Sequence, residues 1–98
     1  MAVKKLPSHV KVFGTKIKIT QEPEANMPDL LGEFIADESR IRISNKLNQD
    51  AARETLLHEI IHAAFFISGH SELLKPTHEE ALIRMLEKAL IPFINESF

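Results

Sequence analysis

Two histidines one helical turn apart are the residues best suited to chemistry in this sequence. His58, Glu59 and His62 form the pattern HExxH. In an α-helix, positions four apart differ by about 40° around the axis, so both imidazoles face one side and can ligate one zinc ion. Glu59 lies about 100° from His58, which keeps it off the metal but within reach of a water molecule. The pattern predicts a Zn²⁺ site with Glu59 as the catalytic general base.

A catalytic zinc ion usually has a third protein ligand, and the chain has no cysteine to provide one. The candidates are His78, Glu79 and Glu80, at the start of the next expected helix. Its apolar positions define the expected buried face: Leu82, Met85, Leu86, Ala89, Leu90 and Phe93. His78 and Glu79 each lie within about 50° of the centre of that face, whereas Glu80 points away from it. We predict Glu79 as the third ligand, with His78, Glu80 and, more weakly, His70 as alternatives.

The helix that carries HExxH should be the central element of the fold. Asp50 is expected to cap its start, and Ser68 with Gly69 to end it, because glycine adopts the left-handed conformation without strain. Its apolar residues surround nearly the whole circumference: Leu56, Leu57, Ile60, Ile61, Ala64 and Ile67. Such a helix should be a buried element packed on the sheet on one side, and its buried histidines would be costly without a metal or other partners.

Short strands precede this helix. Apolar and polar residues alternate on both sides of a turn at residues 13–15, which predicts one hairpin, and again within residues 34–44, which predicts another. Pro23 and Pro28 mark residues 21–31 as a loop. We expect a mainly antiparallel sheet of about four strands. Arg40–Ser44 is either an edge strand able to pair with a substrate peptide or an ordinary sheet strand with Arg40 and Arg42 facing solvent.

The second helix is expected to begin after Pro76. Thr77 and Glu80 have the spacing of a capping box, and Pro92 should fray or end the helix. A sheet followed by two helices is an α+β arrangement, and we expect residues 1–98 to form a single domain.

Composition excludes several classes of protein. A net charge of −2 provides no basic field for a phosphate backbone, so no nucleic-acid partner is expected. No apolar run is long enough to span a bilayer, and residues 1–7 lack the apolar stretch of a signal peptide. We therefore expect a cytoplasmic protein with no membrane association.

From Ile41 onward the chain resembles the ImmA/IrrE family of zinc metallopeptidases and the minimal phage-encoded metallopeptidases of the same gluzincin type. Four segments carry the resemblance: Ile41-Arg42-Ile43-Ser44, residues 54–63, Glu79 and Ala89-Leu90-Ile91-Pro92. In that family a glutamate ligand precedes a helix that often ends in two leucines, an apolar residue and proline, and this alignment puts the ligand on Glu79. The resemblance implies a minimal zincin whose substrate is a regulatory protein, such as a repressor.

The leading hypothesis is a zinc metalloendopeptidase that acts on a protein or peptide. The chain has no tyrosine, so His78, His70 or the zinc alone would have to stabilise the oxyanion. One alternative is a non-catalytic interaction module whose metal is closed off by four protein ligands, His78 among them. Another is an α+β adaptor without metal, whose stability a chelator would not change.

Overall fold

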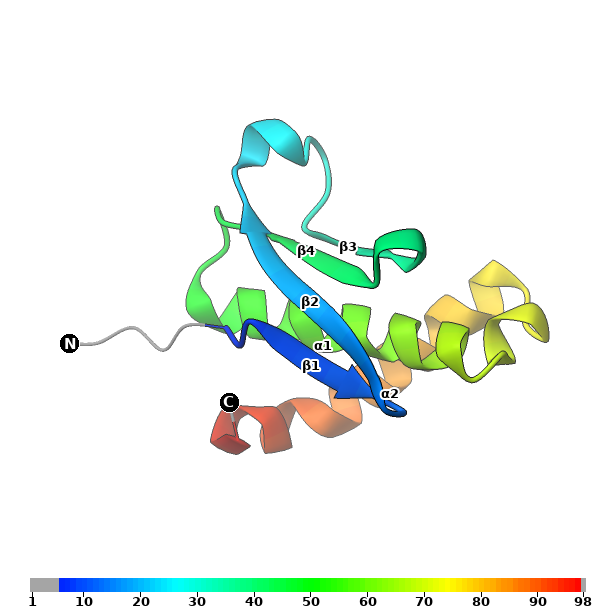
Figure 1. The fold of residues 1–98 in the computed structure, drawn as a ribbon. Coiled ribbons are helices and arrows are strands. Elements are labelled where there is room, and N and C mark those ends of the chain that lie inside the picture. Colours follow the sequence, from blue (N-terminus) through cyan, green and yellow to red (C-terminus); the bar gives the residue numbers. More distant parts are fainter. Residues whose placement is uncertain (1–5, 98) are drawn as a thin grey trace.

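The fold is a four-stranded sheet followed by two long helices, as seen in a computed structural model that describes residues 6–97 (Figure 1). The strands and helices are β1 (His9–Val12), β2 (Thr15–Glu22), β3 (Gly32–Ile35), β4 (Arg40–Ser44), α1 (Gln49–Ile67) and α2 (Pro76–Ser97). Single 3-10 turns are η1 (Glu24–Asn26), η2 (Ala36–Glu38) and η3 (His70–Glu72). The α+β prediction is confirmed. The sequence analysis predicted that residues 1–7 form no signal peptide. Residues 1–5 of that segment lie outside the described residues.

The sheet is mixed, with strand order β1-β2-β4-β3. β1 with β2 and β3 with β4 form the two expected antiparallel hairpins, and the hairpins join through the parallel pair β2 and β4. Of the two alternatives for Arg40–Ser44, the edge strand was wrong and the ordinary sheet strand agrees with the structure, because β4 lies between β2 and β3. Its Ile41 and Ile43 are fully buried, as suits a central strand. The edge strand of this hairpin is β3.

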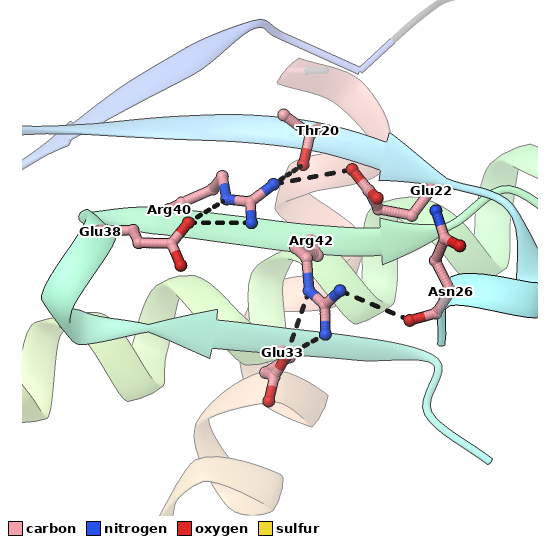
Figure 2. Close-up of polar contacts among 7 residues, drawn as sticks. All are labelled: Thr20, Glu22, Asn26, Glu33, Glu38, Arg40 and Arg42. Carbon is pink, nitrogen blue, oxygen red and sulfur yellow. Dashed lines mark hydrogen bonds and ion pairs between the residues drawn. The ribbon is translucent and has the colours of Figure 1, made fainter. Parts of the chain in front are cut away.

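Ion pairs cover the outer face of the sheet (Figure 2). Arg42 on β4 donates from two guanidinium nitrogens to the Glu33 carboxylate on β3. Arg40 pairs with Glu38 at 2.9 Å and with Glu22 on β2 at 3.6 Å. These contacts connect β4 with both neighbouring strands, so the arginines support the sheet and hold the edge strand in place.

Helix α1 is packed on the sheet, as predicted, and also on α2. The first core lies between the sheet and α1: Val12, Ile17, Ile19, Ile41, Ile43, Ala52, Leu56 and Ala63. The second lies between α1 and α2: Leu57, Ile61 and Ile83. Figure 1 shows α1 crossing beneath the sheet, with α2 on its far side. Neither of these two helices, the long ones of the described chain, is long and apolar enough to cross a membrane.

The ends of α1 were predicted to within two residues. The N-cap is Asn48, whose side chain accepts a hydrogen bond from the Ala51 amide at 2.8 Å, and not Asp50. Asp50 instead lies in the first turn, where a negative charge is favourable. Ser68 is the C-cap and Gly69 has φ +83°, as predicted.

Helix α2 is rotated from the predicted orientation. It begins at Pro76, with the Glu79 amide donating to the Lys75 carbonyl, so Thr77 lies inside the helix and forms no capping box. Proline suits this first position because its missing N–H would have no helical partner. Ile83 is fully buried, whereas Met85 is 56% and Phe93 64% exposed.

The far end of α2 also differs from the prediction. Pro92 lies within the helix, which continues to Ser97, so the expected end at Pro92 was wrong. Proline removes one backbone donor, and a helix can continue past it when the surrounding turns keep their bonds.

Candidate metal centre

The two motif histidines lie side by side on the surface of α1 that faces α2. Their ring centroids are 4.9 Å apart and both side chains are partly buried, 18% exposed for His58 and 26% for His62. This proximity follows from their four-residue spacing on a regular helix. Both Nε2 atoms point toward the same carboxylate.

That carboxylate belongs to Glu80 on α2. One oxygen lies 2.8 Å from the Nε2 of His58 and the other lies 3.1 Å from the Nε2 of His62. The three side chains can each offer one ligand atom within 4.8 Å of the others, and they form the one such group of donors found among the described residues. The structure thus puts Glu80, an alternative in the sequence analysis, between the two histidines.

Two further glutamates of α2 contact the opposite nitrogens of the rings. The Glu79 carboxylate lies 3.0 Å from the Nδ1 of His62, and the Glu87 carboxylate lies 2.7 Å from the Nδ1 of His58. Glu79, the predicted third ligand, therefore lies beside the site but on the far side of the His62 ring from Glu80. Both ring nitrogens of His58, and both of His62, therefore lie close to a carboxylate oxygen.

The rotation of α2 explains which glutamates face α1. Glu80, Ile83 and Glu87 are separated by three and four residues, so they lie along one stripe of the helix. Ile83 is fully buried against α1 and fixes that stripe inward. His78 and His70 are exposed, and neither joins the donor group.

Glu59 is buried next to the histidines, with 9% of its surface exposed. Burial raises the pKa of the Glu59 carboxyl, and the nearby Glu80 carboxylate acts in the same direction. The two histidines and a hydrogen bond from the Phe34 backbone amide oppose that rise in pKa. A carboxyl group with a raised pKa is better matched to proton transfer near neutral pH.

A glycine allows α1 to approach the edge strand closely. A Cβ atom at Gly32 would lie 2.6 Å from the Thr55 methyl group, 3.2 Å from Ile43 Cδ1 and 3.3 Å from Glu59 Cγ. The first distance is far shorter than a van der Waals contact, so only glycine fits without displacement of a neighbour. The absent side chain brings Glu59 next to β3.

Two open pockets meet at Gly32 and Glu59. The larger pocket has a volume of about 460 Å³ and is also lined by Phe34, His62 and Glu79. The smaller pocket has a volume of about 270 Å³. The residues around the smaller pocket are Leu31, Gly32, Thr55, His58, Glu59, Glu80, Arg84 and Glu87. Solvent and a ligand can therefore reach Glu59 and both histidines along β3.

The donor set fits zinc. Two imidazole nitrogens and a carboxylate oxygen are ligands that Zn²⁺ accepts, whereas Ca²⁺ and Mg²⁺ prefer oxygen ligands alone. Three converging donors next to open pockets are typical of a catalytic site, because a structural zinc site is usually closed by four protein ligands.

Comparison with models of protein families provides a match for most of the chain. The model of the SprT-like family matches residues 8–90, which include both hairpins, α1 and every donor described above. The chain belongs to the SprT-like family. SprT-like domains form a zinc-binding, metallopeptidase-like family, and the α+β fold of this SprT-like chain fits a minimal zincin. No match was found among curated proteins or among solved structures.

Sequence reasoning missed three features of this SprT-like site. Gly32 and the Phe34 amide could not be found, because their role depends on how β3 meets α1. Glu87 had a usable signal: it follows Glu80 by seven residues, two helical turns, and so shares its face.

Proposed function

We propose that this SprT-like protein is a zinc-dependent metallopeptidase whose metal is held by His58, His62 and Glu80. The observation that carries the proposal is the position of the Glu80 carboxylate, which has one oxygen near each Nε2 atom. Glu79, the ligand predicted from the sequence, remains the alternative, since it contacts the other face of His62. A zinc ion held there supplies Lewis-acid activation of water and of the scissile carbonyl.

Glu59 is proposed as the general base. It accepts a proton from the attacking water and returns it to the leaving amine. The buried carboxylate and its hydrogen bond from the Phe34 amide support this role, because they hold the group at a fixed place beside the histidines. Arg84, which is 70% exposed and 3.8 Å from Glu80, lies at the smaller pocket and is proposed as a cationic donor for a developing oxyanion.

The substrate is proposed to be an extended peptide that aligns along β3. β3 is the outer strand of the sheet beside the site, and the pockets on both sides of Glu59 follow it. An edge strand offers backbone groups for pairing with a peptide. The resemblance to the ImmA/IrrE family supports a regulatory protein as the source of that peptide.

Turnover of a mixed fluorogenic peptide library by the zinc-loaded protein tests the proposal. Glu59→Gln should keep the zinc and lose at least about 100-fold in turnover, because it cannot accept the proton. Glu54→Gln is a matched control, since Glu54 lies on α1 outside both pockets and should retain full turnover. Equal turnover by wild type and Glu59→Gln would refute the assigned base, and no hydrolysis by the zinc-loaded wild type would favour the interaction module.

A further inference from the structure

Both nitrogens of His58 are engaged by carboxylates from a single helix. Nε2 lies 2.8 Å from Glu80 and Nδ1 lies 2.7 Å from Glu87. The Glu87 side chain is 21% exposed, less than that of Glu80 at 35%, so it lies deeper between the helices. At 2.7 Å, the contact of Nδ1 with Glu87 has the length of a charge-assisted hydrogen bond, which is among the stronger ones in proteins.

The chemistry of imidazole gives this contact a specific consequence. A neutral imidazole carries one N–H, and the nitrogen without hydrogen is the one that can bind a metal. A carboxylate can only accept a hydrogen bond, so Glu87 favours the tautomer with the proton on Nδ1. That tautomer leaves the Nε2 lone pair directed at the donor group.

We propose that Glu87 is a positioning residue, which fixes the ring orientation and the tautomer of His58 and thereby strengthens metal binding. The inference rests on the proposed metal site. Carboxylates that accept from the second nitrogen of a ligating histidine raise its basicity, and their loss typically weakens metal binding by about 10- to 100-fold. Glu79 contacts the Nδ1 of His62 in the same way, so α2 would supply one ligand and two positioning carboxylates.

The helix geometry ties this role to packing. Glu80 and Glu87 lie two turns apart, and Ile83 between them is fully buried against α1. Ile83 therefore keeps both carboxylates facing the same histidine. The contact between Glu87 and His58 is therefore held by core packing, unlike an ion pair between two freely moving surface side chains.

Zinc affinity, measured by competition with a chromophoric chelator, tests the proposal in Glu87→Ala and Glu87→Gln. Glu87→Ala should bind zinc about 10- to 100-fold more weakly, and Glu87→Gln should fall between it and wild type, because the amide oxygen still accepts a hydrogen bond. Glu72→Gln is the charge-matched control, as Glu72 is exposed on η3, and should keep wild-type affinity.

Nitrogen-15 NMR of the zinc-loaded proteins reports the protonation of each His58 ring nitrogen. This protonation would not change if Glu87 only supported the fold. His58 of the wild type should show a protonated Nδ1 with slow solvent exchange, and Glu87→Ala should lose that slowly exchanging proton. Wild-type affinity and an unchanged His58 spectrum in Glu87→Ala would overturn the proposal while leaving the metal site intact. No zinc binding by the wild type would instead overturn the site itself. If Glu87→Ala does not fold, the same two measurements on Glu87→Gln decide.

Discussion

The two faces of α2 reverse the usual distribution of side chains on an amphipathic helix. The face against α1 carries Glu79, Glu80 and Glu87 around Ile83, which is fully buried. Elsewhere on α2, several large apolar side chains are exposed: Leu82, Met85, Leu90 and Phe93. The comparison teaches that a helix face can be half-buried through acidic side chains when each carboxylate has a histidine partner, and that apolar spacing alone then indicates the wrong orientation.

The largest expected difference between the faces is in stability. Ile83→Ala should lower the free energy of unfolding by about 2–5 kcal/mol, because it leaves a cavity between α1 and α2. Met85→Ala, at an exposed site on the other face, should change it by less than about 0.5 kcal/mol. Urea denaturation of the two variants measures both values. A larger loss in Met85→Ala would mean that α2 packs through its apolar face.

The adjacent acids Glu79 and Glu80 should differ in metal binding. Glu80→Ala should weaken zinc binding by more than about 100-fold, because it removes a ligand, whereas Glu79→Ala should weaken it by about 10- to 100-fold. Chelator competition at fixed pH ranks the two variants. The opposite ranking would favour Glu79 as the ligand.

Gly32 should be intolerant of even a methyl group. Gly32→Ala should destabilise the protein by about 1–3 kcal/mol, since the new Cβ would overlap the Thr55 methyl group. Adding Thr55→Ser removes that methyl group and should restore part of the loss. Thermal unfolding of the single and double variants measures the effect, and the absence of any rescue would assign the strain to another neighbour.

The smallest expected effect concerns Glu59 in the metal-free protein. Burial raises the pKa of Glu59, so the carboxyl group binds its proton more tightly in the folded protein than in the unfolded chain. Protonation of Glu59 therefore stabilises the folded state, and this stabilisation is lost as the pH rises through the folded-state pKa. Glu59→Gln should therefore be more stable than wild type at neutral pH by on the order of 1 kcal/mol.

The pH dependence of that difference provides the check. The advantage of Glu59→Gln should shrink as the pH falls and Glu59 becomes protonated. The ionisable groups that face Glu59 are His58, His62 and Glu80, and their charges interact with residue 59 only in the wild type, so they contribute to the measured difference. Denaturation curves in chelator at several pH values measure the difference. A variant less stable than wild type at neutral pH would contradict the stated effect of burial.

The sequence predicted α1 well because its signals are local. The HExxH spacing, the apolar circumference and Gly69 each act within a few residues, so helix limits and histidine geometry followed directly. The orientation of α2 could not be predicted in the same way. Its strongest periodic signal, the apolar stripe through Met85, consists mostly of exposed residues, and the partners of Glu80 lie on another helix.

The order of the strands also depends on distant contacts. Alternation within residues 34–44 predicted a hairpin but not which of its strands would pair with β2. The parallel pairing of β2 with β4 buries Ile41 and Ile43 fully and leaves β3 at the edge beside Glu59. Only the assembled sheet shows why a glycine is needed at position 32.

The most direct test of the metal site is a crystal structure of the zinc-loaded protein, with anomalous diffraction recorded at the zinc edge. We expect one zinc ion per chain, ligated by the Nε2 atoms of His58 and His62 and by a carboxylate oxygen of Glu80. A protein that retains no zinc, or a zinc ion ligated through Glu79 with Glu80 turned away, would contradict this assignment.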